Sequence, residues 1–209
     1  MRSHIALSML TSLLCAHVAF ADFKYTAQTR SVSVQDGNEM HSAPDFSPFD
    51  STSSITITYP NAGFANQHQS SILGPQSISI VGNFDGLAPT YAGTGYVSGE
   101  SVTSVTFDVL EDTSVSFQAQ WSRVPYYTVS ILGPGMNFYV NTPGLSSFSK
   151  SGVLTPGSYH LTVDMITQKF GGGPITSNFS ALLTVPEPSS LVFAAACATI
   201  LARRRCRSG

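Results

Sequence analysis

The sequence has few charged residues. Only 11% of its 209 residues are Asp, Glu, Lys or Arg, against ~25% in typical soluble domains. A long helical bundle is disfavoured, because exposed helix faces are usually covered by Lys and Glu. Nucleic-acid binding through a basic surface is excluded, since neutralising phosphates requires Lys and Arg that the chain lacks. Charge-driven disorder is excluded too, because 42% of the residues are hydrophobic.

Cysteine is absent from most of the chain. The three cysteines are Cys15, Cys197 and Cys206, and residues 22–185 contain none. That segment therefore has no disulfide framework, no cysteine nucleophile and no thiolate ligand for zinc. Its stability must come from burial of a hydrophobic core, for which it is long enough.

Catalytic motifs are missing as well. The sequence contains no Gly-x-Ser-x-Gly elbow, no His-Glu-x-x-His, no P-loop and no dinucleotide fingerprint. His41, His68 and His160 are far apart, and no pair has the spacing of metal ligands. Serine is so frequent that Ser, His and Asp can be combined in many ways by chance, so such a combination is no evidence for a catalytic triad. The sequence predicts a protein that is not an enzyme and has no cofactor.

Calcium is the one metal for which candidate ligands exist. Asp108, Glu111 and Asp112 cluster at the end of an expected strand, and the loop segment 36–39 reads Asp-Gly-Asn-Glu. Calcium prefers about six to eight oxygen ligands, and neither cluster supplies them alone. Ordinary turn composition explains both clusters, so calcium is kept only as a weak alternative.

The N-terminus has the form of a secretory signal. Arg2 precedes an apolar run over residues 5–16, and Ala19 and Ala21 place small residues at positions −3 and −1 of a cleavage site. We expect a signal peptide over residues 1–21, with export by the Sec machinery. A lipoprotein signal at Cys15 is disfavoured, because a bulky Leu precedes it.

The C-terminus is a second targeting segment. A proline-rich motif is followed by a short apolar run, residues 189–202, and then by arginines. As a helix this run would be ~21 Å long, which is short for a hydrocarbon core of ~30 Å. Arginines after an apolar run stay cytoplasmic and stop translocation, which leaves the preceding domain outside. The motif is Pro186, Glu187 and Pro188, and the membrane stop is Arg203, Arg204 and Arg205.

This order of elements resembles the PEP-CTERM sorting signal of Gram-negative bacteria, and the resemblance covers residues 186–209. It implies recognition by a membrane enzyme, exosortase, that cleaves near the motif. It further implies a transient anchor in the inner membrane, then release to the cell surface or the exopolysaccharide matrix.

Between the two signals, the composition is typical of β-structure. Val, Ile, Phe, Tyr, Ser and Thr alternate in short runs that end at Gly, Pro or acidic residues. We expect an all-β fold over residues 22–185, a single antiparallel, jelly-roll-like β-sandwich with Ser, Thr and Gln on its solvent faces. Residues 35–52 and 171–174 are expected as loops. The expected strands are 53–59, 77–81, 102–109, 114–121, 127–132, 138–140, 159–165 and 179–185.

One turn carries a recognisable pattern. Residues 154–161 resemble the Leu-x-x-Gly-x-Tyr-x-Leu strand entry of many exported β-sandwich domains. Gly157 allows a tight turn, Tyr159 is expected to pack at a sheet corner, and His160, in the opposite phase, is expected to face solvent.

Trp121 is the only tryptophan, and it shares its alternation phase with Phe117, so core packing is the first interpretation. If it is exposed, Trp121 with Tyr126 or Tyr127 would offer aromatic faces to a sugar. Two hypotheses follow. The first is a non-catalytic cell-surface or biofilm-matrix protein, and the alternative is a carbohydrate-binding module that recognises exopolysaccharide.

Overall fold

A computed structural model describes residues 22–35, 39–58, 62–89, 95–123, 126–141 and 146–186. The expected signal peptide, and the sorting tail beyond Pro186, lie outside the described residues. Within the described part, no helix has the length and apolar character needed to cross a membrane.

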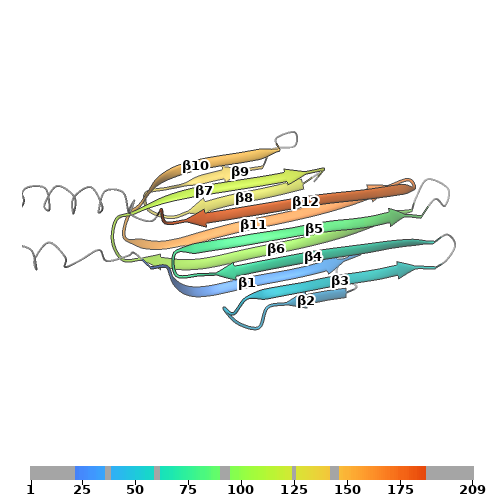
Figure 1. Ribbon diagram of the computed structural model, residues 1–209, viewed down its shortest axis with the longest axis horizontal. Helices are drawn as coiled ribbons and strands as arrows, with labels where there is room; N and C mark the ends of the chain where they lie inside the picture. The colour runs from blue at the N-terminus through green and yellow to red at the C-terminus, as the bar shows by residue number, and fades with distance from the viewer. Residues whose placement is uncertain are drawn as a thin grey trace, which may run out of the picture.

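Every regular element of the described residues is a β-strand (Figure 1). The strands are β1 (Lys24–Val34), β2 (Glu39–Ser42), β3 (Phe49–Ile57), β4 (Gly63–Leu73), β5 (Ser77–Ala88), β6 (Tyr96–Val109), β7 (Thr113–Ser122), β8 (Tyr126–Leu132), β9 (Phe138–Val140), β10 (Ser147–Leu154), β11 (Gly157–Phe170) and β12 (Gly173–Thr184).

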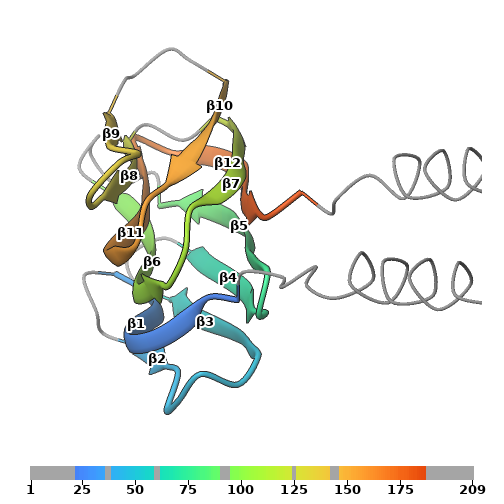
Figure 2. The same cartoon turned by 90° about the vertical axis from the view of Figure 1, so that its left-hand side faces the viewer.

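The strands form two six-stranded antiparallel sheets, which Figure 2 shows facing each other. Sheet A has the order β2-β1-β6-β11-β8-β9, and sheet B has the order β10-β7-β12-β5-β4-β3. The prediction of an antiparallel β-sandwich is therefore confirmed. The longest strands, β6 and β11, pair in the middle of sheet A over their whole length.

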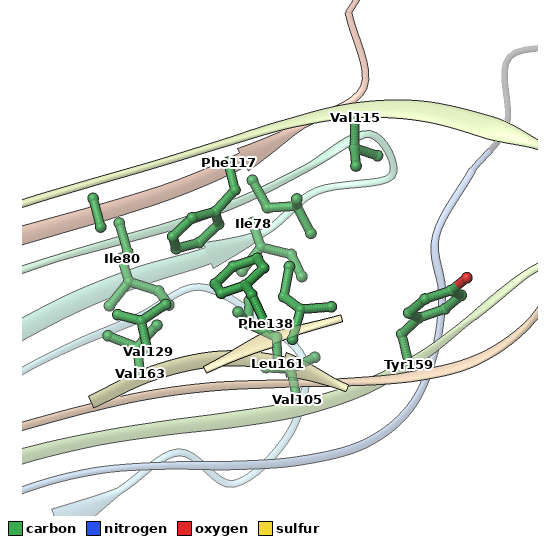
Figure 3. Close-up of a cluster of buried hydrophobic side chains, with 14 of the residues drawn as sticks. Ile78, Ile80, Val105, Val115, Phe117, Val129, Phe138, Tyr159, Leu161 and Val163 are labelled. Atoms are coloured by element: carbon green, nitrogen blue, oxygen red, sulfur yellow. The ribbon is translucent and has the colours of Figure 1, made fainter. Parts of the chain in front are cut away.

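Period-two alternation explains why these segments pair as they do. In β7 the apolar residues at alternate positions are buried and the polar residues between them face solvent. The same holds for β6 and β11, so the buried phases of the two sheets meet in one large core. Figure 3 shows Ile78, Phe117, Val129, Leu161 and Val163 among the side chains that fill it.

The interior is not uniformly apolar. A second, smaller cluster forms around Phe84 and Val97, and buried polar side chains occupy inward positions of β1, β4 and β6. Gln69 lies on β4 and donates to the hydroxyl of Thr103 at 2.6 Å, while Ser101 donates to the amide oxygen of Gln69 at 2.8 Å. Mutual hydrogen bonding of this kind makes a polar interior tolerable.

Two expected loops are shorter than predicted. Residues 35–52 were expected to be a loop, but this is wrong, because β2 and the start of β3 lie within them. The segment 171–174 is also not a loop throughout. Only Gly171 and Gly172 link β11 to β12, both with positive φ (71° and 68°), a conformation that glycine adopts without steric cost.

The two ends of the domain meet at one turn. The amide of Phe23, just before β1, donates to the carbonyl oxygen of Pro75 at 2.7 Å. The amide of Val185, just after β12, donates to the carbonyl oxygen of Gln76 at 2.9 Å. Both acceptors lie in the β4–β5 turn, so the chain enters and leaves at the same end of the sandwich (Figure 1).

Candidate functional site

The predicted aromatic site is divided between the core and the surface. Trp121 on β7 and Tyr127 on β8 point into the sandwich and are only 6% and 3% exposed. Tyr126, in the opposite phase of β8, is 60% exposed. The structure therefore does not bring the three rings together on one face, because neighbouring residues of a strand point to opposite faces.

Trp121 does reach the rim of an open depression on the outer side of sheet B. Its lining is mostly hydroxyl and amide groups, with ring atoms contributed from inside. The lining residues are Gln120, Trp121, Ser122, Ser146, Ser147, Asn178, Phe179 and Ser180. Because the indole stacks on Tyr127 and is nearly fully buried, the depression offers hydrogen bonds and no aromatic platform.

A better-formed site lies on the outer face of sheet A. There Glu100 on β6 stands opposite both Ser33 on β1 and Ile166 on β11, and Ile166 stands opposite Tyr126 on β8. Directly opposed residues of antiparallel strands have Cβ atoms ~4.5–5.5 Å apart. The four side chains therefore form a continuous row across four strands.

Beside this row the face is hollowed. A groove of about 120 Å³ is lined by Ser33, Gln35, Ser98, Gly99, Glu100, Ile166 and Gln168. Gln35 builds one wall. It follows β1 with a positive φ of 49°, and its side-chain oxygen accepts from the amide of Ser98 at 3.0 Å. The backbone amide of Gln35 also donates to the Ser98 carbonyl oxygen at 3.1 Å, so two hydrogen bonds hold this wall against β6.

Asp164 on β11 lies on the same face, two residues before Ile166. Its Oδ1 is buried and has no hydrogen-bond partner among the described residues. Burial, and then the nearby carboxylate of Glu100, raise the pKa of Asp164 to about 6. Within the described part of the chain, the only ion pairs are those of His41 and His68. The two carboxyl groups therefore lack a cationic partner there.

The three histidines among the described residues do not form a common site; each contacts its own neighbours. His160 faces solvent, as predicted. The contacts are His41 Nε2 with Glu39 Oε1 at 3.2 Å, His68 Nε2 with Asp50 Oδ1 at 2.8 Å, and the His160 ring with the hydroxyls of Ser104 at 3.2 Å and Thr106 at 3.1 Å. Among the described residues no three His, Cys, Asp or Glu side chains gather as metal ligands.

Two residues of the acidic clusters considered for calcium take part in hydrogen bonds of the fold. Glu111 lies in the turn between β6 and β7, where its carbonyl oxygen accepts from the hydroxyl of Thr113 at 2.8 Å. Glu39 accepts from the amide of Ser54 at 3.2 Å through its carboxylate. The remainder of the second cluster, residues 36–38, lies outside the described residues.

Arg30 is a buried charge that the sequence did not indicate. It is fully buried on β1, and its Nη2 donates to the carbonyl oxygens of Asp45 and Ser47. Its Nη1 donates to the Ser71 carbonyl oxygen at 3.3 Å, and its Nε donates to Gln28 Oε1 at 3.1 Å. Burial lowers the pKa of Arg30, although the charges of Asp45 and Tyr25 oppose this shift. Arg30 therefore ties the β2–β3 connection to the sandwich.

Sequence reasoning missed the residues of the sheet A groove. Glu100 and Asp164 are isolated acidic residues in alternating strands, and Gln35 and Gln168 look like ordinary polar positions. The one available signal was the alternation phase, which predicts that Asp164 and His160 share the solvent face of β11. The pairing of β1, β6, β11 and β8 in one sheet could not be deduced.

No protein-family model matches the chain, and the comparison with curated proteins finds no match. Among solved structures, the chain is similar to the carbohydrate-binding module TmCBM61 in complex with β-1,4-galactotriose (10% identity, 65% of this chain and 88% of that chain, TM-score 0.23). It is also similar to a carbohydrate-binding module of family 29 (10% identity, 76% and 89%, TM-score 0.22). A third is the GH31 α-xylosidase from Xanthomonas citri (9% identity, 79% and 28%, TM-score 0.22). TM-scores this low do not establish a shared fold, so nothing about the ligands of these proteins is transferred to this chain.

Proposed function

We propose that this chain is an exported, non-catalytic protein of the cell surface or the exopolysaccharide matrix, held briefly in the inner membrane by an exosortase-type sorting tail. The observation that supports this is the common exit of both domain ends at the β4–β5 turn. We also propose that the domain has a jelly-roll-like topology. This is supported by the successive strands β5 to β8, which alternate between sheet B and sheet A.

The position of the exit has a physical consequence for a tethered domain. Pro186 follows Val185 directly, so a membrane tail would begin at the end of the sandwich that holds the β4–β5 turn. Both ends of the domain lie at one end of the long axis of the sheets (Figure 1). An anchor at that end would leave both outer sheet faces accessible to the matrix.

The arginines of the tail supply the test. Replacing all three of Arg203, Arg204 and Arg205 by Gln removes the positive charge that would hold the tail in the cytoplasm. We expect the variant to accumulate with an unprocessed tail, while the wild-type protein reaches the surface fraction. Arg123→Gln is the control, because it removes a charge from an exposed position of the domain. Equal processing and surface yield of all three proteins in cell fractionation would contradict the proposal.

We propose a second function, the binding of matrix polysaccharide, because the groove on sheet A carries hydrogen-bonding groups beside the exposed ring of Tyr126. Sugars are bound by such combinations of polar groups and flat aromatic faces. Retention of the full chain on immobilised exopolysaccharide from the host is the measurement. Loss of retention in Tyr126→Ala but not in Tyr139→Ala, a similarly exposed tyrosine on β9, supports this function. No retention of the wild type overturns it.

A further inference from the structure

We infer that the outer face of sheet A binds a polysaccharide whose sugars carry free amino groups, with Glu100 and Asp164 receiving the amine and Tyr126 packing against a sugar ring. This inference rests on the second proposed function and names the class of its ligand.

The first support is the placement of the two carboxyl groups. Asp164 stands opposite Val102 on β6 and Thr128 on β8, while Glu100 stands opposite Ile166, the next outward residue of β11. Their side chains are therefore diagonal neighbours on one face, within reach of a single ligand group. Glu100 lines the groove and is exposed.

The second support is the uncompensated negative charge. One oxygen of Asp164 is buried without a partner among the described residues, which is costly for a polar atom. Repulsion between two neighbouring carboxylates adds to that cost. A ligand ammonium group beside Glu100 and Asp164 would lower this repulsion through its positive charge, whereas a neutral hydroxyl would supply only a hydrogen bond.

The groups packed around Asp164 strengthen this argument. From β6, the outward residues facing it are Glu100, Val102 and Ser104, and from β8 they are Tyr126, Thr128 and Ser130. On β11 itself the outward neighbours are Thr162 and Ile166. None of these side chains is cationic, so no described residue on this face offers a positive charge to the two carboxyl groups, and a cationic ligand group would be the complementary partner.

The third support is the apolar end of the same row. Ile166 is half-buried, and Tyr126, directly opposite it, is 60% exposed. A pyranose ring has apolar C–H faces that complement a tyrosine ring, and it can lie along the row while its amine reaches the carboxyl end. Gln168 and Ser33 on the groove wall provide donors and acceptors for ring hydroxyls.

The test compares three soluble probes of equal length: the hexasaccharide of glucosamine, the hexasaccharide of N-acetylglucosamine, and cellohexaose. Binding to the full chain in mild detergent is measured by calorimetry at a pH of about 6.5. We expect the glucosamine hexasaccharide to bind about tenfold more tightly than either neutral probe, the gain of one charge-assisted contact.

Two variants locate the site. The double variant Glu100→Gln with Asp164→Asn should weaken binding of the glucosamine probe about tenfold, and Tyr126→Ala should weaken it about fivefold. The matched control is Asp50→Asn with Asp85→Asn, which removes the same charge from the outer face of sheet B. A control that weakens binding equally would mean attraction to overall acidity, and would overturn the inference.

The remaining outcomes are also decisive. If the neutral probes bind as tightly as the amine and Tyr126→Ala weakens them, polysaccharide binding stands and the amino-sugar class is wrong. If no probe binds although the full chain is retained on the host exopolysaccharide, the amino-sugar inference is overturned alone; if the chain is not retained either, the second proposed function fails with it. Calcium binding that is lost in the double variant, without binding of any sugar, would assign the two carboxyl groups to a metal and overturn the inference.

Discussion

Trp121 and Tyr127 stack in the core with ring centroids 4.3 Å apart and planes inclined by 22°. Trp121 belongs to β7 of sheet B and Tyr127 to β8 of sheet A, so the pair joins the two sheets. Burial raises the pKa of the Tyr127 hydroxyl, whose oxygen has no partner among the described residues. Two of the three aromatics considered as sugar contacts therefore contribute to cohesion of the sandwich.

Truncation of Trp121 should lower the stability of the domain, because the ring is part of the core and not of a ligand-binding surface. Trp121→Ala removes a buried ring and should lower the free energy of unfolding by about 3–5 kcal/mol, while Trp121→Phe keeps a ring for Tyr127 and should cost less. Urea denaturation followed by near-ultraviolet circular dichroism measures both. A loss below about 1 kcal/mol for the alanine variant would show that the ring is not packed as described.

Arg30 should be required for stability although it forms no ion pair in the described residues. Arg30→Met leaves the carbonyl oxygens of Asp45, Ser47 and Ser71 without their donor, and each charge-assisted bond lost costs about 1.5–3 kcal/mol. We expect a total loss of at least about 3 kcal/mol, together with faster proteolysis in the β2–β3 connection. Lys24→Met, at an exposed position of the same strand, is the control and should leave both measurements unchanged.

Asp164 should make stability fall as the pH rises. Its pKa lies at about 6 in the folded protein, above the ordinary value of 3.8. The folded state therefore binds more protons between these values, and the free energy of unfolding decreases as the pH increases through that window. After allowance for solvent screening, the loss is about 1–2 kcal/mol.

The variant Asp164→Asn isolates this effect. It should be more stable than the wild type at pH values above about 6, and the difference should shrink towards pH 4. Asp108→Asn, on the same outer face, serves as the matched control. Denaturation midpoints measured across this range would reject the prediction if the difference between Asp164→Asn and the wild type did not change with pH.

The turn into β11 should be sensitive at two positions for different reasons. The Tyr159 hydroxyl donates to the carbonyl oxygen of Thr155 at 2.9 Å, so Tyr159→Phe should cost about 1 kcal/mol. Gly157 has a φ of 148°, and an added Cβ would lie 2.6 Å from Cγ of Pro134. Gly157→Ala should therefore cost more than Tyr159→Phe in urea denaturation. The reverse order would contradict the described turn.

The success of the strand prediction depended on what each strand buries. In β7 and β11 the inward positions are almost all apolar, so alternation identified them. In β4 the inward positions include Gln67, Gln69 and Ser71, and in β1 they include Arg30, so those strands lacked an apolar period and were missed. The edge strands β2 and β10 were missed because they bury few side chains.

The residues of the candidate site were also predictable only in part. Phase alone placed His160 outward and Tyr159 inward, and both predictions are confirmed. Phase also opposes Tyr126 to Tyr127, so at most one of them can share a face with Trp121. The groove was beyond prediction, because it needs residues from β1, β6 and β11 that lie far apart in the sequence.

The sequence by itself determined an all-β body without cysteine and its polar solvent faces, and it predicts targeting signals at both ends. These properties are local, since composition and alternation act over a few neighbouring residues. Only the tertiary structure decided which strands pair, and with them the burial of Trp121, the polar interior around Arg30 and the meeting of Glu100 with Asp164. Strand order depends on the packing of the whole sandwich. A strand can in principle pair with the edge of either sheet, and only the complete core determines which strands become its neighbours.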